Sequence, residues 1–364
     1  MPLSLAERLK ESIRREGPVT FHDWMRTALY DPAGGYYQRS DSERWGREGD
    51  YRTSPERSEL FAATFARYFA KLYDGRDAWS IVECGAGDGR FAAGVLRTLA
   101  ERFPQVFAAT RYLVYELSDD ALRRARERLI EFGDRVEFYS DFERVSARRG
   151  IYFSNELLDA FPVHRVIMTG DGLSELYVSL DSEDRFVWSA GPLSSARLAE
   201  FCKAHELSEG QIVEINLAID EWVARVAGKL EEGFLITVDY GEEAGELYDP
   251  LRRPNGTLRG FSRHAFVDDV LGQPGECDLT TTINWTQVKG TGERLGFEVV
   301  EFASQDKFLL NAGLLEELEL RLRQVETDAQ RLSLSTSARE MILPGGMASS
   351  FQVLVQRRAT DYTD

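Results

Sequence analysis

The feature that most restricts the fold is a run of glycines directly after a short apolar segment. Residues 81–89 read IVECGAGDG, with Gly85, Gly87 and Gly89 at alternate positions. Glycines let the backbone turn sharply and approach a ligand closely, and such a run between a strand and a helix is typical of nucleotide-binding α/β folds. The sequence therefore predicts a strand, a tight ligand-binding turn and a helix, in this order.

Short apolar runs alternate with helical periods beyond this point, which predicts βαβ units and a mostly parallel, Rossmann-like sheet. The expected strands are 80–83, 111–116, 136–139, 150–154, 234–239, 297–302 and 351–357. The expected helices are 89–103, 119–132, 217–230 and 314–330. At 364 residues, the chain is long enough for such a core with large additions.

Three further segments surround the predicted core. Residues 3–16, 21–29 and 58–73 have helical periods, with Thr20 as an N-cap, and predict an N-terminal helical extension over 1–75. Three strand-like runs, at 163–168, 175–180 and 185–189, predict a small antiparallel sheet inserted over 161–211. The core is then expected at 76–160 and 212–364, with 242–282 as a long loop or lid.

Carboxylates follow the predicted strands where a ligand would bind. Glu83 precedes the first glycine, and a carboxylate there favours the cationic amino and sulfonium groups of S-adenosylmethionine over a pyrophosphate. Glu116 ends the next strand, where it can accept hydrogen bonds from both ribose hydroxyls or instead serve as a helix N-terminal charge. Asp141 could meet an adenine amino group, although aspartate is also a common helix cap.

The fourth strand leads into the segment SNELLDAFPV, which predicts the reactive end of the site. Ligands of open α/β sheets bind outside the carboxyl ends of strands, so Asn155 and Glu156 are expected to face the cofactor. Glu156 and Asp159 would share one face of a helical turn and could hold a guanidinium by bidentate hydrogen bonds. The alternative is that both acids cap a helix and pair with arginines. No metal site is expected.

Charge and cysteine content indicate the class of partner and the compartment. The formal charge of −17 opposes binding to nucleic-acid phosphates or an anionic membrane surface. The three cysteines form no pair motif, which predicts a reducing compartment. The N-terminus lacks a signal peptide and is too acidic for a transit peptide, and no apolar run suffices for a membrane span. A cytoplasmic protein is therefore expected.

Several blocks together resemble the MidA-like methyltransferase family. They are the glycine motif, FHDWMRTALYDPAGGYY (21–37), GREGDYRTSPE (46–56), SNELLDAFPV (154–163), DYG (239–241) and GTLRGFSRHAFVDDVLGQPGECDLT (256–280). Such blocks, in the same order over most of the chain, are more specific than one glycine loop. The sequence departs from the family at Ala86, where proline is usual, and at Cys84 and Tyr51, which replace an apolar residue and phenylalanine.

The resemblance implies a class I methyltransferase core that binds S-adenosylmethionine, with Tyr51, Thr53 and Pro55 in a loop that folds over the cofactor. Mitochondrial members of the family are complex I assembly factors that methylate protein arginine, so a protein substrate with an acceptor arginine is implied here. Three alternatives stay open: a methyltransferase of small molecules, a non-catalytic cofactor-binding assembly or chaperone module, and, last, a nicotinamide-dependent oxidoreductase. The oligomeric state cannot be read from the sequence.

Overall fold

The computed structural model describes residues 3–39, 59–262, 265–343 and 350–359. The chain divides into two compact units. Unit 1 contains residues 1–52, 158–222 and 241–288, and unit 2 contains residues 53–157, 223–240 and 289–364. The division into an extension (1–75), a core (76–160 and 212–364) and an insertion (161–211) stays a prediction. Contacts join the start of the chain and the whole of the segment 161–211 into unit 1.

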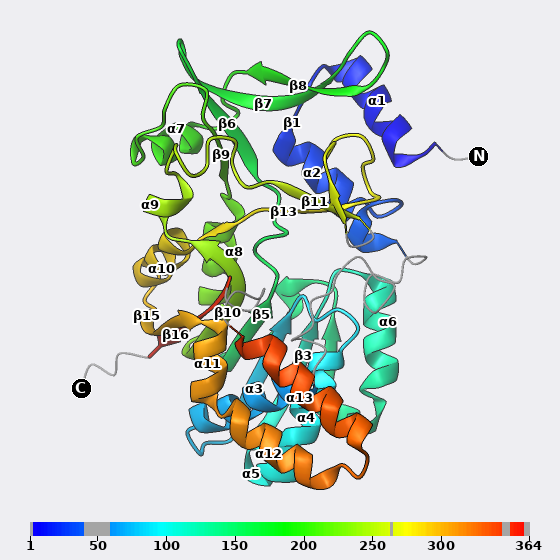
Figure 1. The fold of residues 1–364 in the computed structure, drawn as a ribbon, viewed down its shortest axis with the longest axis vertical. Helices are drawn as coiled ribbons and strands as arrows, with labels where there is room; N and C mark the ends of the chain where they lie inside the picture. The colour runs from blue at the N-terminus through cyan, green and yellow to red at the C-terminus, as the bar shows by residue number, and fades with distance from the viewer. Residues whose placement is uncertain (1–2, 40–58, 263–264, 344–349, 360–364) are drawn as a thin grey trace. The chain divides into compact units, whose positions relative to one another are not determined.

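A mixed sheet forms the centre of unit 2. Its parallel strands are β2 (Trp79–Cys84), β3 (Thr110–Tyr115), β4 (Val136–Tyr139), β5 (Arg149–Asn155) and β10 (Glu232–Glu242). The strand order is β15-β16-β10-β5-β2-β3-β4. Figure 1 labels β15, β16, β10, β5 and β3 of this sheet. All six residues of β2 are buried, as expected for a parallel strand covered on both faces. The predicted parallel α/β core is confirmed.

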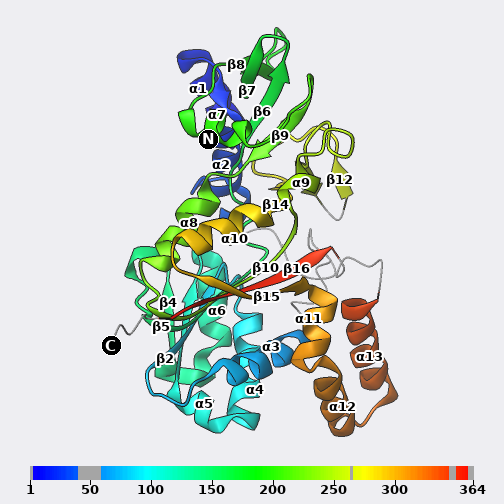
Figure 2. The same ribbon diagram turned by 90° about the vertical axis from the view of Figure 1, so that its left-hand side faces the viewer.

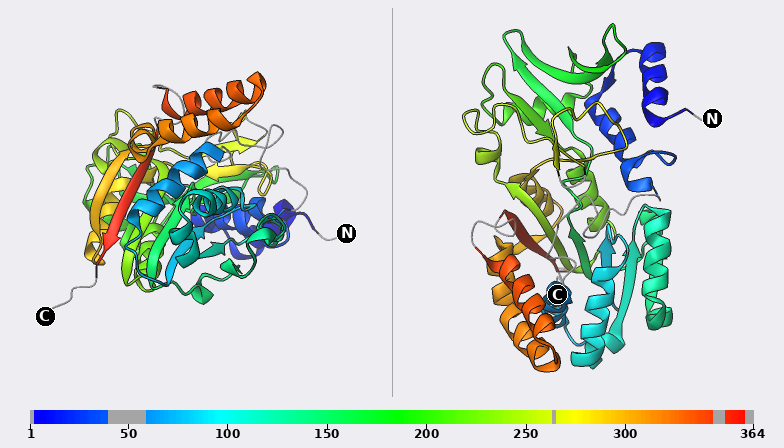
Figure 3. Two further views of the ribbon diagram at one scale, coloured as in Figure 1. Left: turned by 90° about the horizontal axis from the view of Figure 1, so that it is seen from below. Right: turned by 45° about the vertical axis from the view of Figure 1, so that its right-hand side comes forward.

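Two C-terminal strands complete this sheet with the opposite pairing. β16 (Phe351–Arg358) lies antiparallel to β10, and β15 (Glu298–Ser304) lies antiparallel to β16. Figure 3 shows these two strands side by side, in orange and red. The sequence predicted both strands within two residues, but it did not predict their direction, because direction depends on which neighbour each strand pairs with.

Helices cover the sheet of unit 2, and an aromatic core lies beneath them. They include α3 (Glu59–Leu72), α4 (Arg90–Arg102), α5 (Pro104–Ala109), α6 (Asp119–Arg128) and α11 (Gln305–Ala312). Figure 2 shows α11 beside α3. The ring of Phe65 on α3 contacts Phe91 and Phe308. The aromatic side chains of α3 therefore belong to the core of unit 2.

The predicted helices 314–330 and 119–132 are each too long. The first corresponds to α12 (Leu314–Gln324), which ends at Gln324. A separate helix, α13 (Asp328–Ile342), then begins with a capping box formed by Thr327 and Gln330. Thr327 accepts a hydrogen bond from the backbone N–H of Gln330, so the N-cap starts a new helix there instead of extending the old one. The second predicted helix gives way to the 3-10 helix η2 (Ile130–Arg135).

Unit 1 begins with two capped helices. α1 (Leu5–Glu16) has a capping box between Ser4 and Glu7, and its buried Leu5, Leu9 and Ile13 lie at helical spacing. α2 (Phe21–Tyr30) starts at Thr20, whose hydroxyl accepts the N–H of Asp23 at 3.1 Å, as predicted.

An antiparallel sheet follows these helices in unit 1. It contains β1 (Val19–Thr20), β6 (His164–Thr169), β7 (Gly172–Leu180), β8 (Phe186–Gly191) and β9 (Ile212–Ile215). The predicted inserted sheet of β6, β7 and β8 is confirmed. The prediction omitted β1 and β9, which are too short to show a clear period of two. α7 (Ala196–Lys203) connects β8 to β9.

The prediction of a long loop over 242–282 is wrong. This segment contains α9 (Ala244–Leu247) and a sheet of β11 (Arg259–Ser262), β12 (Ala265–Val267) and β13 (Asp278–Thr280). Strands of three or four residues give almost no periodic signal. β14 (Ile283–Asn284) pairs with the end of β10. α8 (Ala218–Ala227) and α10 (Trp285–Arg294) each contribute residues to both units. Among the described residues, no helix has the length and apolar character to cross a membrane.

Candidate functional site

The order of the parallel strands defines a switch point in unit 2. From β2 the chain moves outward to β3 and β4, and from β5 it moves the other way to β10. Neighbouring β2 and β5 pair from Ser80 with Gly150 to Cys84 with Ser154. Ligands of doubly wound sheets bind outside the carboxyl ends of the strands at such a point. The glycine motif follows β2 and Asn155 ends β5, so the sheet brings these two predicted segments together.

The glycine motif has a backbone that only glycine adopts easily. Gly85, Gly87 and Gly89 have φ values of +73°, +55° and +77°. A Cβ on Gly85 would lie 3.1 Å from Cδ1 of Leu157, and one on Gly89 would lie 3.0 Å from Cβ of Ala125. Side chains would therefore both strain this turn and crowd its neighbours. Leu157 was not among the predicted site residues, although it lies within the SNELLDAFPV block.

Glu116 is fixed by the glycine motif itself. Its carboxylate accepts the backbone N–H of Gly87 at 2.9 Å and that of Ser118 at 2.8 Å. Ser118, and not Glu116, caps α6 through the N–H of Ala121. The alternative that Glu116 serves α6 is thus weakened, and a carboxylate orientated beside the turn remains.

Asn155 and Glu156 lie where β5 ends. The backbone N–H of Glu156 donates to the carbonyl of Val238 on β10 at 2.9 Å, while its φ is +51°. A non-glycine residue in the left-handed region costs of order 1–3 kcal/mol, and such residues cluster at functional sites. The side-chain amide of Asn155 donates to Oε1 of Glu156 at 3.4 Å.

The predicted helical turn after Glu156 is absent, since residues 156–160 form bends and turns. The expectation that Glu156 and Asp159 share a helical face is therefore wrong, as is the alternative that they cap a helix. In the left-handed conformation, Glu156 cannot itself be part of a right-handed helical turn.

Two other predicted ligands have protein partners. Glu83 is buried and accepts the hydroxyl of Tyr112 at 2.7 Å. Burial and the nearby carboxylate raise the pKa of Tyr112 well above its usual value, so this phenol stays protonated as a donor. Asp141 caps η3 (Phe142–Arg144) by accepting the N–H of Glu143 at 3.0 Å, which is the capping alternative that the sequence left open.

Asp159 belongs to unit 1, where it lies in a buried group of acids and tyrosines. The hydroxyl of Tyr37 donates to Asp278 at 2.7 Å. Burial, followed by the charges of Asp278, Tyr30 and Asp159, raises the pKa of Tyr37. Asp278 was not among the predicted site residues, although it lies in the 256–280 block. Tyr51, Thr53 and Pro55 lie outside the described residues.

The residues at the switch point suit S-adenosylmethionine. The turn at Gly85–Gly89 provides a close backbone approach that a Cβ would fill, and Glu116 offers an orientated carboxylate for hydroxyl donors. In the described residues, no group of three or more histidine, cysteine, aspartate or glutamate side chains has the arrangement of a metal site.

Curated relatives cover most of the chain. It is 27% identical to protein arginine methyltransferase NDUFAF7, mitochondrial, of Rattus norvegicus, over 87% of this chain and 76% of the relative. The human protein of the same name is 26% identical over 95% of this chain and 82% of the relative. These mitochondrial relatives contradict the cytoplasmic prediction, which was wrong because it judged location from the composition of the first residues alone.

Solved structures agree with the fold. A COG1565 superfamily member from Burkholderia thailandensis, bound to S-adenosyl-homocysteine, matches with a TM-score of 0.87 at 30% identity, covering 98% of this chain and 92% of the other. A native structure from the same organism matches with a TM-score of 0.84. Residues 60–303 match a family described as S-adenosyl-L-methionine-dependent methyltransferases. The chain belongs to this MidA-like family and is an S-adenosylmethionine-dependent methyltransferase.

Proposed function

We propose that the methyl acceptor is an arginine nitrogen of a protein. The names of the curated relatives support this acceptor, since they are called protein arginine methyltransferases. The observation that carries most weight in this chain is Glu156, a carboxylate in a strained backbone conformation where β5 ends at the switch point. A carboxylate binds a planar guanidinium with two parallel hydrogen bonds, which fixes its orientation as well as its position.

The cofactor would be held by residues around the glycine motif. Gly85, Gly87 and Gly89 allow the close backbone approach, Glu116 accepts the ribose hydroxyls, and Glu83 faces the cationic end. Asp141 is the proposed partner of the adenine amino group. Tyr51, Thr53 and Pro55 are proposed as covering residues by family resemblance. When bound, S-adenosylmethionine supplies a methyl group on a positively charged sulfur.

The chain's own contribution to transfer would be orientation and exclusion of water. Glu156 would hold the guanidinium, and Asn155 keeps the carboxylate of Glu156 in place through its amide. Asp159 is proposed as an acceptor-binding residue from the sequence pattern alone. One acceptor nitrogen would gain the methyl group as its bond to sulfur breaks, S-adenosylhomocysteine would be the leaving group, and the nitrogen would release one proton to solvent. A chain with a net charge of −17 favours a cationic acceptor over an anionic one.

Calorimetric titration with S-adenosylmethionine and S-adenosylhomocysteine tests the cofactor site. Micromolar affinity is expected in the native protein, and it should be lost in Gly87→Arg, because an arginine side chain would occupy the turn. Loss of binding would assign the site to this motif. Unchanged affinity in the variant would place the cofactor elsewhere.

Glu156→Gln tests the acceptor role separately. The amide keeps the shape but loses the charge, so methylation of peptide arginine should fall by about 100-fold while S-adenosylhomocysteine affinity stays within severalfold. Glu127→Gln, at an exposed position on α6, is the matched control. Unchanged methylation in Glu156→Gln would refute this role. Methyl transfer to small molecules alone would instead support a small-molecule methyltransferase. Cofactor binding without methyl transfer would support a non-catalytic assembly or chaperone module.

A further inference from the structure

A groove in unit 2 has a composition opposite to that of the whole chain. It has a volume of about 720 Å³ and is lined by α3, α4, α6 and α12. Its lining contains five arginines and three glutamates, whereas the chain has 44 basic and 61 acidic residues. A basic groove on an acidic protein points to a ligand of negative charge.

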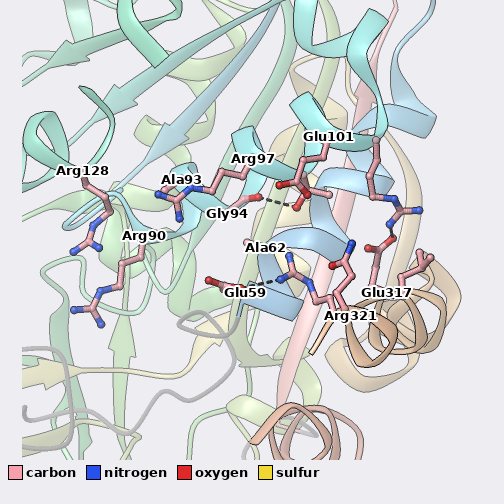
Figure 4. A pocket seen from close by; sticks show the side chains of 14 residues that line it. Glu59, Ala62, Arg90, Ala93, Gly94, Arg97, Glu101, Arg128, Glu317 and Arg321 are labelled. Carbon is pink, nitrogen blue, oxygen red and sulfur yellow. Dashed lines mark hydrogen bonds and ion pairs between the residues drawn. The ribbon is translucent and has the colours of Figure 1, made fainter. Parts of the chain in front are cut away.

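Three of the five arginines lie toward one end of this groove, whereas Arg102 and Arg321 lie toward the end with Glu317. Figure 4 shows Arg90, Arg97 and Arg128 together, on the side away from Glu317. Arg90 and Arg128 share a single carboxylate oxygen of Asp88, each at 3.0 Å. Because each guanidinium has five N–H donors, one carboxylate leaves most of these donors available to a further acceptor.

Arg97 and Arg321 extend the same donor surface. Arg97 directs Nε and Nη2 to one oxygen of Glu131, and its side chain is 51% exposed. Arg321 on α12 donates to Glu59 on α3 at 2.8 Å. The Arg97–Glu131 pair is exposed on both sides, and such pairs are weak, typically about 0–1 kcal/mol, so an incoming carboxylate can compete for the guanidinium of Arg97.

The spacing favours an extended chain as the ligand. Arg90 and Arg97 lie seven residues apart on α4, a rise of about 10.5 Å. An extended peptide in the polyproline II conformation covers nearly that distance in three residues, at about 3.1 Å each, and completes one turn. Acidic side chains at positions i and i+3 would then lie on the same side and meet both arginines.

We propose that this groove binds an acidic, extended segment of a partner protein. The apolar Ala62, Ala93 and Leu320 provide a floor for the segment, and the arginines bind its carboxylates. At about 0.1 M salt the Debye length is about 10 Å, so repulsion by distant acids of the chain is screened while direct contacts persist. The proposal does not depend on the acceptor of the methyl group.

Fluorescence anisotropy with a labelled peptide carrying glutamate at every third position tests the groove. At about 0.1 M salt the native protein should bind it with micromolar affinity. The double variant Arg97→Glu with Arg321→Glu should bind it at least about tenfold more weakly, because two attractive contacts become repulsive. A peptide with lysine at the same positions should not bind.

Arg123→Glu is the matched control, since Arg123 is an exposed, ion-paired arginine of α6 that does not line the groove. Unchanged S-adenosylhomocysteine affinity and circular dichroism would show that each variant folds. Equal peptide affinity in native protein and double variant, or no binding to native protein, would overturn the proposal. So would preference for inorganic triphosphate or an RNA oligonucleotide over the peptide.

Discussion

Two glycines, Gly89 in the glycine motif and Gly296 outside it, allow the energetic cost of backbone strain to be measured apart from the cost of side-chain crowding. Gly89 has a φ of +77° and crowded surroundings, whereas Gly296 has a φ of +84° with no atom within 4 Å of an added Cβ. We expect Gly296→Ala to lower the free energy of unfolding by about 1 kcal/mol, and Gly89→Ala by about 2–3 kcal/mol. Urea unfolding measures both values. Equal losses would show that the contact with Ala125 does not matter.

A histidine pair predicts the pH dependence of stability. The rings of His22 and His164 stack with centroids 4.5 Å apart, although they are far apart in sequence. Burial, and then the charge of His164, lowers the pKa of His22 below its usual 6.5. The unfolded chain therefore takes up this proton first as the pH falls, so stability is complete above about pH 6.5 and declines below it.

His22→Gln removes this titration and should flatten the fall in unfolding free energy between about pH 7 and pH 5. Chemical denaturation at a series of pH values measures the slope. Identical slopes in native and variant protein would mean that other groups carry the dependence.

At the scale of elements, one buried carboxylate connects α12 to α3 and α4. The side chain of Glu317 is 2% exposed and pairs with Arg102 on α4 and with Arg67 on α3. Glu317→Gln should lower the free energy of unfolding by about 1–3 kcal/mol, because two guanidinium groups lose their charged acceptor. Glu319→Gln, whose side chain is 66% exposed, should change it by less than about 0.5 kcal/mol in the same denaturation experiment. A small effect at both positions would contradict this role.

The elements also show which signals the sequence carried. β4 was predicted residue for residue, and β2, β3 and β5 within one or two residues, because buried strands are short apolar runs between turns. The strands β11 to β13 were missed because strands of three or four residues are too short to show an alternating apolar pattern. Their pairing with neighbouring strands stabilises them instead. The break between α12 and α13 depends on the cap at Thr327, which the helical period obscured.

For the whole molecule, ligand binding should be linked to the stability of unit 2. S-adenosylhomocysteine at about 100 times its Kd should raise the free energy of unfolding by about 2.7 kcal/mol, because only the folded turn binds it. Scanning calorimetry should show a higher Tm in the native protein and no shift in Gly87→Arg. A shift of equal size in the variant would mean that the ligand binds outside the glycine motif.

The sequence alone determined the parts of this protein that depend on neighbouring residues. The glycine turn, the cap at Thr20 and the buried strands follow from local backbone preferences and from the spacing of apolar residues. Only the tertiary structure decided the strand order that puts the glycine motif next to the end of β5. It also decided the contact of Tyr37 with Asp278, because pairings between distant segments depend on packing that no local pattern encodes.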